Sequence, residues 1–139
     1  VHKIQKYDNF LKRCISKKIY QTNGSQSLWQ FLSNLTQIAR SLYHFLTDMN
    51  KYSIKNIAKE EELNSLCEMV KILKKTYFAK DLANLKDLHE LYDKLEDTKK
   101  DFSKSESLVQ HHLLLIGRII YLAGSPLTGY FHVNSHEIN

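Results

Sequence analysis

The stretch LWQFLSNLTQIARSLYHFLTDM, residues 28–49, decides the fold class of this chain. Its apolar side chains recur every three or four residues, which is the period of an α-helix and not of a β-strand. They are Leu28, Trp29, Phe31, Leu32, Leu35, Ile38, Ala39, Leu42, Tyr43, Phe45, Leu46 and Met49. A stripe this wide predicts a helix that is central to a bundle or that presents a face to a partner. We expect the central helix, with Trp29 as its anchor in the core.

Helical periodicity also covers residues 2–20, 60–75, 82–102 and 108–122, so the pattern predicts about five helices. Gly24 is a natural stop after the first of them, and Gly124-Ser125-Pro126 is a natural stop after the last. Ser27 and Gln30 have the spacing of a capping box at the start of the second helix. Asp81 is placed to cap the helix that follows it.

The predicted fold is therefore all-α, a compact bundle over residues 1–125 followed by an irregular C-terminal tail at 126–139, where periodicity is lost. The chain has only four Gly and one Pro among 139 residues. Strand-rich folds need more of these turn residues, which disfavours a sandwich or a barrel. No Gly-rich phosphate loop is present in the sequence, which disfavours a doubly wound nucleotide-binding fold.

The first predicted helix combines an apolar stripe with most of the excess positive charge. The chain has 20 Lys and Arg against 15 Asp and Glu, and residues 3–18 hold the densest basic cluster. The stripe, which we expect to pack inward, consists of Ile4, Tyr7, Leu11, Cys14 and Ile15. We interpret the basic side as a solvated face. A nucleic-acid-binding face is the alternative, and its affinity would fall steeply with salt.

No catalytic, metal-binding or cofactor-binding motif stands out, so we predict a protein that is not an enzyme and holds no cofactor. His111 and His112 are adjacent and point about 100° apart on a helix, so they cannot both face one metal ion. His112 shares the apolar stripe of the last helix, which predicts a core histidine. Cys14 and Cys67 are interpreted as buried structural thiols in a reducing compartment.

Two observations concern the location of the protein. Asn23-Gly24-Ser25 and Asn34-Leu35-Thr36 match the N-glycosylation pattern, which keeps a secreted, cytokine-like bundle with a Cys14–Cys67 disulfide as an alternative. The apolar run 113–123 is interrupted by Gly117 and Arg118 and is too short to span a bilayer, so we predict no membrane partner. The chain begins with a residue other than Met, which we interpret as a domain excised from a longer protein.

The segment from Lys74 to Lys80 is the candidate partner-binding site. Tyr77 and Phe78 lie between Lys74 and Lys75 on one side and Lys80 on the other, at a predicted turn between two helices. In one interpretation, one ring packs inward and the other lies flat on the surface. In the sharper interpretation, an exposed ring with a basic rim anchors an acidic, hydrophobic peptide. The candidate partner-binding residues are Lys74, Lys75, Tyr77, Phe78 and Lys80.

The same region carries a family resemblance. EMVKILKK (Glu68–Lys75), followed by LKDLHELYDKL (Leu85–Leu95), resembles the helical core of the TFIIS N-terminal domain family, which includes integrase-binding domains, over residues 28–97. The resemblance implies a nuclear bundle that grips short disordered motifs of transcription and chromatin factors. It also implies a peptide-gripping aromatic in the turn after the Lys-Lys pair. The matching position is Ala79, one residue past Phe78.

The sequence therefore predicts an intracellular, nuclear protein–protein interaction domain of a larger protein. Its partner is a short hydrophobic and acidic motif or a helix. An oligomerisation or scaffold domain is the alternative, because the wide apolar faces at 28–46 and 108–122 are also suited to pairing between subunits. The secreted bundle and the nucleic-acid-binding module remain as further alternatives.

Overall fold

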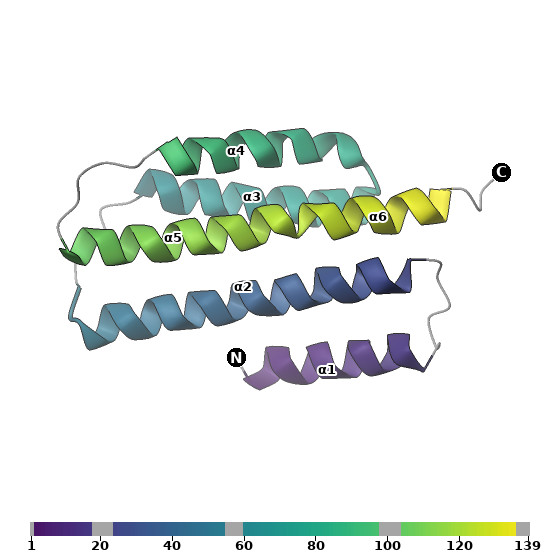
Figure 1. Ribbon diagram of the computed structural model, residues 1–139, viewed down its shortest axis with the longest axis horizontal. Helices are drawn as coiled ribbons and strands as arrows, with labels where there is room; N and C mark the ends of the chain where they lie inside the picture. The colour runs from purple at the N-terminus through teal and green to yellow at the C-terminus, as the bar shows by residue number, and fades with distance from the viewer. Residues whose placement is uncertain (1, 18–23, 55–59, 98–103, 136–139) are drawn as a thin grey trace.

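The computed structural model describes residues 2–17, 24–54, 60–97 and 104–135, and in these ranges it contains helices and turns but no strand. The elements are α1 (His2–Ser16), α2 (Ser25–Lys51), α3 (Glu60–Ala79), the 3-10 helix η1 (Leu82–Asn84), α4 (Leu85–Asp97), α5 (Lys104–Leu122) and α6 (Gly124–Ser135). Only Ala123 separates α5 from α6, and the two form one nearly continuous rod (Figure 1). The described helices therefore form a bundle of five rods, and the predicted all-α fold is confirmed.

The α5–α6 rod lies in the middle of the bundle (Figure 1). It packs against α2 on one side, and α5 packs against α3 and α4 on the other. The most deeply buried large side chains come from four of these helices, which places the core around α5. They are Met69, Leu88, Leu95, Leu113, Ile116, Ile120 and Leu127. The helix α1 lies at the outer edge of the bundle and packs mainly against α2.

The caps of the helices follow the sequence in one case and depart from it in another. The helix α3 ends where Lys80 adopts a left-handed conformation with φ of 54°. The Asp81 carboxylate then accepts a hydrogen bond from the Ala83 backbone N–H at 2.9 Å, so the predicted cap is confirmed. The predicted capping box is wrong, because α2 begins at Ser25 after Gly24 and has no side-chain cap. Ser27 lies close to Gly129 of α6 instead.

The predicted irregular tail is wrong for residues 126–135, which belong to α6. Pro126 did not signal an end, because a proline is tolerated in the first turn of a helix, where its missing N–H needs no partner. Leu127 is fully buried, so α6 is part of the core. Residues 136–139 of the predicted tail lie outside the described residues.

Because α5 and α6 form one rod, the apolar stretch is longer than the sequence pattern indicated. The stretch Glu106–Val133 is long and apolar enough, by length and composition, to cross a bilayer, so the sequence-based view that this region is too short is wrong. Core helices of water-soluble proteins have the same length and composition. In this bundle the stretch is the central rod, packed against α2, α3 and α4.

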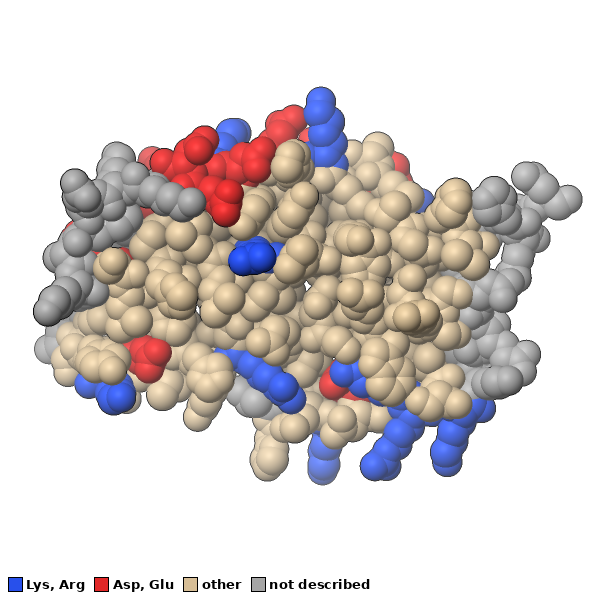
Figure 2. Space-filling model, viewed as in Figure 1, with Lys and Arg blue, Asp and Glu red and all other residues tan. Residues whose placement is uncertain are grey.

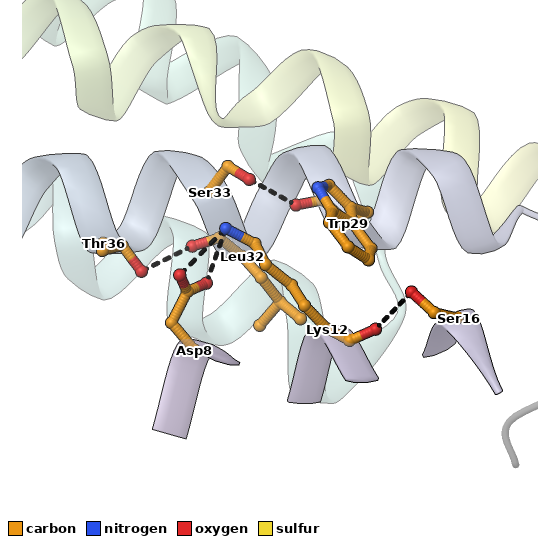
Figure 3. Close-up of polar contacts among 7 residues, drawn as sticks. All are labelled: Asp8, Lys12, Ser16, Trp29, Leu32, Ser33 and Thr36. Carbon is orange, nitrogen blue, oxygen red and sulfur yellow. Dashed lines mark hydrogen bonds and ion pairs between the residues drawn. The ribbon is translucent and has the colours of Figure 1, made fainter. Parts of the chain in front are cut away.

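The helix α1 is rotated about its axis relative to the orientation that its apolar stripe predicted. Ile15 of its apolar stripe is buried and Cys14 is half-buried, but Ile4, Tyr7 and Leu11 are exposed. The side chain that faces α2 is Asp8, which is 8% exposed and lies 2.9 Å from the Lys12 ammonium (Figure 3). The predicted inward stripe is therefore wrong for three of its five members, and the side of α1 turned toward α2 carries an ion pair within α1 itself.

Trp29 is not the core anchor that the sequence predicted, since it is 39% exposed. It lies on the side of α2 that faces α1, where the Lys12 ammonium is 5.6 Å from its ring centroid, the geometry of a cation–π contact (Figure 3). The buried aromatic residues of α2 are Phe31 and Phe45. A tryptophan at the edge of a helix–helix contact buries much of its ring without being enclosed.

Candidate functional site

An apolar groove runs between α2 and α3 and has a volume of about 340 Å³. Its lining is apolar or aromatic except for one lysine. The α2 wall consists of Phe31, Leu32, Leu35 and Ile38, and the α3 wall consists of Val70, Leu73, Lys74, Tyr77 and Phe78. The predicted residues Lys74, Tyr77 and Phe78 therefore share one groove, and they share it with a wall that the sequence analysis did not assign to the site.

The groove lies where α2 and α3 pack against the same helix, α5, while α3 packs most extensively against α4. Phe31, Ile38 and Leu73 point into the core and are buried, so they form the floor. Leu35 and Val70 stand at the mouth and are 39% and 45% exposed. Aliphatic side chains this accessible, facing each other across a hollow, form a surface that a partner can cover.

Four aromatic rings gather at one end of the groove. Tyr77 stacks on Phe31 with ring centroids 5.7 Å apart and planes 12° apart. Phe78 meets Tyr77 edge to face at 5.3 Å, and Phe131 of α6 lies 6.5 Å from Tyr77. Phe78 is 73% exposed, about twice the exposed fraction of Tyr77. Tyr77 is thus the inward ring of the pair, and Phe78 is the ring left free for contact.

The basic residues around the groove are not equivalent. Lys74 lines it, whereas Lys75 and Lys80 are exposed but do not line it. Lys71 donates a hydrogen bond to the Glu68 carboxylate at 2.6 Å, and this bond raises the pKa of Lys71 above its usual value. Its charge is therefore already partnered. Lys74 has no ion-pair partner among the described residues and is the cation best placed to meet a ligand.

The apolar surface continues along both helices beyond the groove. On α2, Leu42 and Leu46 follow Leu35 at spacings of seven and eleven residues, which keeps them on the same helix face. They are 42% and 63% exposed. On α3, the free and exposed Cys67 lies one turn before Val70 and Lys71. From Phe31 to Leu46 the strip is roughly 22 Å long at ~1.5 Å per residue.

The α2 wall is the part of the site that sequence reasoning missed. The available signal was the width of the apolar stripe in residues 28–49, which exceeds what one core contact needs. From sequence, the stripe predicts a core helix, with a partner face as the alternative. The structure divides the stripe into two parts. Buried are Phe31, Ile38, Phe45 and Met49, whereas Leu35, Leu42 and Leu46 are exposed.

The other candidate chemistry of the sequence falls elsewhere. His112 is buried as predicted, and its Nε2 atom lies 2.9 Å from an Asp48 carboxylate oxygen, which joins α5 to α2. The prediction of two buried thiols is wrong, because Cys14 is half-buried and Cys67 is exposed, and both are free. In the described part of the chain, no three His, Cys, Asp or Glu side chains gather as a metal site would require.

Of the two glycosylation patterns, only one can be placed. Asn34 is half-buried, and its side-chain amide donates to the Leu122 carbonyl at 3.4 Å. Its amide therefore faces the α5–α6 junction. Asn23 lies outside the described residues.

Comparison with protein-family models, characterised proteins and solved structures finds no match for this chain. The resemblance to the TFIIS N-terminal domain family therefore stays a prediction. The position that matches the family's peptide-gripping aromatic is Ala79, the last residue of α3, and the exposed ring beside it belongs to Phe78.

Proposed function

We propose that this chain is a non-enzymatic protein-interaction domain that binds a short, hydrophobic and acidic segment of a partner in the groove between α2 and α3. The observation that carries the proposal is the groove itself, in which exposed apolar side chains from two helices surround a buried apolar floor. Helix-in-groove recognition uses this kind of surface, with large side chains of the ligand spaced three, four or seven residues apart.

The exposed side chains supply the apolar part of the proposed contact. Phe78, Leu35 and Val70 are each more than one third exposed and lie around the same hollow. Fully burying one large apolar side chain contributes about 1.5–3 kcal/mol. Leu35 and Val70 are already more than half buried, and the costs of association offset much of this sum. These three side chains alone therefore give a weak contact, with a dissociation constant above the micromolar range. Within such a site, Phe78 is the expected hot spot because aromatic anchors dominate binding energy.

The charges around the groove favour an acidic ligand. Lys74 lines the groove and has no ion-pair partner within the described ranges, and Lys75 and Lys80 are exposed nearby on the same helix and the turn after it. The α2 wall has no Asp or Glu between Ser25 and Thr47. On α3 the nearest carboxylate, that of Glu68, is occupied by Lys71. Acidic residues flanking the apolar anchors would meet positive charge and no repulsion.

The cellular setting follows only from the family resemblance. On that basis we propose a nuclear, intracellular protein whose partner is a transcription or chromatin factor with a disordered motif. The groove itself requires no particular compartment, so the binding proposal stands independently of the location.

The test is selection of peptides from a random phage-displayed library on the immobilised chain. We expect enriched peptides with two or three large apolar residues at helical spacing and with flanking Asp or Glu. Phe78→Ala should weaken their binding at least tenfold, since hot-spot truncations commonly exceed ~1.4 kcal/mol. Its circular dichroism should be unchanged, because the ring is 73% exposed. Tyr77→Ala is a poorer test, because it removes a ring that stacks on Phe31.

Two matched controls make the outcome decisive. Phe10→Ala removes another well-exposed phenylalanine, from α1, and should leave peptide binding unchanged. Lys74→Glu should weaken binding more than Lys86→Glu, which makes the same charge change on exposed α4. Peptides that bind Phe78→Ala as well as the unmodified chain would disprove the groove as the site. If light scattering showed a dimer that Phe78→Ala converts to a monomer, the occupant of the groove would be a second copy of this chain and not another protein.

A further inference from the structure

The outer edge of the bundle carries a second surface, formed by α1 alone and separate from the groove. Tyr7 and Phe10 are 68% and 63% exposed, and Ile4 and Leu11 are 45% and 38% exposed. Ile4, Tyr7 and Leu11 are spaced by three and four residues, so they form one stripe, with Phe10 beside it. This arrangement leaves four large apolar side chains of one short helix in contact with water.

Basic side chains accompany these rings. Lys3, Lys6, Arg13 and Lys17 are exposed and recur with Phe10 at alternating spacings of three and four residues, which places them on one side of the helix. Lys and Arg side chains project along the edge of the molecule that α1 occupies (Figure 2). The one carboxylate of α1, that of Asp8, is turned inward and paired with Lys12. The outward face of α1 therefore carries positive charge without negative charge.

We propose that α1 is a peripheral membrane-binding helix that lies flat on a surface of anionic phospholipids. Helices of this kind place aromatic and aliphatic side chains at the boundary between headgroups and acyl chains and direct Lys and Arg to the headgroup phosphates. Here Tyr7, Phe10 and the two aliphatic residues enter the interface, and the four basic residues contact phosphate. The absence of a membrane partner was predicted only from the lack of a spanning segment, which does not bear on this mode of binding.

The distribution of charge over the bundle would orient it on such a surface. The helix α4 lies at the edge opposite α1 (Figure 1), and that upper edge carries the larger group of acidic side chains (Figure 2). The helix α4 contains five Asp or Glu residues and two lysines. An anionic membrane would attract the α1 edge and repel the α4 edge, so both ends of the molecule favour the same orientation.

The acidic α4 edge of a second copy is a weaker occupant for α1. It offers complementary charge, but the described residues of α4 include no exposed large apolar side chain to cover Tyr7 and Phe10. A nucleic acid would likewise satisfy the basic residues, but its phosphate backbone has nothing apolar to offer Ile4 and Leu11. Of these three occupants, the lipid interface is the one that offers both anionic groups and an apolar layer to the α1 face.

The test is co-sedimentation of the whole chain with vesicles of equimolar phosphatidylserine and phosphatidylcholine, compared with vesicles of phosphatidylcholine alone. We expect binding to the anionic vesicles that weakens with salt, and little binding to the neutral ones. Lys3→Gln with Lys6→Gln should lower the partition coefficient roughly 25-fold, about fivefold for each lysine near the surface. The matched control is Lys86→Gln with Lys94→Gln on α4, which changes the net charge equally and should not lower binding.

A second pair of variants tests whether the exposed rings of α1 contribute to vesicle binding. Tyr7→Ser with Phe10→Ser should lower partitioning at least tenfold, whereas Phe78→Ser, which removes an exposed ring from the groove, should not. Equal binding of all variants, or equal binding to neutral vesicles, would overturn the proposal. So would tight binding to duplex DNA that depends on Lys3 and Lys6 but not on the rings. A dimer in solution that Tyr7→Ser with Phe10→Ser dissolves would show that a second copy covers α1 instead.

Discussion

The helices α1 and α5 both carry apolar side chains at helical spacing, but their surroundings in the structure are opposite. In α5, Leu113, Ile116 and Ile120 are almost completely buried. In α1, Ile15 is the buried member of a stripe of five, and most of the others face water. The difference lies in the neighbours: α5 packs against α2, α3 and α4, whereas α1 packs mainly against α2. Periodicity shows which side of a helix is apolar, but burial depends on how many helices surround it.

The largest expected effect comes from truncating the same residue type in both helices. Leu113→Ala should lower the free energy of unfolding by about 2–5 kcal/mol, because it removes buried contacts and leaves a cavity. Leu11→Ala, at a position 38% exposed in α1, should cost less than ~1 kcal/mol. Urea denaturation followed by circular dichroism measures both. Equal costs would show that α1 is as much a part of the core as α5.

A second prediction concerns the polar contact in the interior between α2 and α5. Asp48→Ala removes the carboxylate that meets His112 Nε2. The other ring nitrogen of this histidine is buried and has no hydrogen-bond partner in the part of the chain that the structure describes. Leaving a buried polar group unsatisfied costs about 1–3 kcal/mol, so Asp48→Ala should destabilise the bundle by this amount. Asn50→Ala, at an exposed position two residues away, is the control and should have little effect. A cost no larger than the control's would mean that the contact is not stabilising.

The comparison also explains which parts of the fold could be predicted. The helices of the core followed from periodicity, because a stripe such as that of α5 is explained by burial alone. The C-terminal helix α6 was missed because Gly124 and Pro126 are the usual signals for a helix end. Here they stand at the start of the next helix, and Leu127 gains its burial from packing that a local pattern does not reveal.

Only the α3 side of the groove could be predicted from the sequence. Tyr77 and Phe78 attracted notice because two adjacent aromatics exceed what one core position needs. The opposite wall, with Leu35 and Ile38, could not be assigned, because no local signal shows that α3 leaves part of α2 uncovered. The inward turn of Asp8 in α1 was equally invisible, since a carboxylate is ordinarily expected on the outer face.

The smallest expected effect tests how α1 is attached. Asp8→Ala removes the buried carboxylate that pairs with Lys12, whose long side chain can then extend to water. The free energy of global unfolding should change by less than ~1 kcal/mol, because the variant removes the buried charge together with its desolvation cost and the remaining Lys12 ammonium can reach water. Amide hydrogen exchange should nevertheless accelerate in α1 and stay unchanged in α5, since a helix packed mainly on one neighbour can open without unfolding the rest. Asp48→Ala is the contrasting variant, because its loss of protection should extend to α5. If Asp8→Ala accelerated exchange equally in α5, α1 and α5 would unfold as one cooperative unit. The two helices would then differ in the exposure of their side chains but not in local stability.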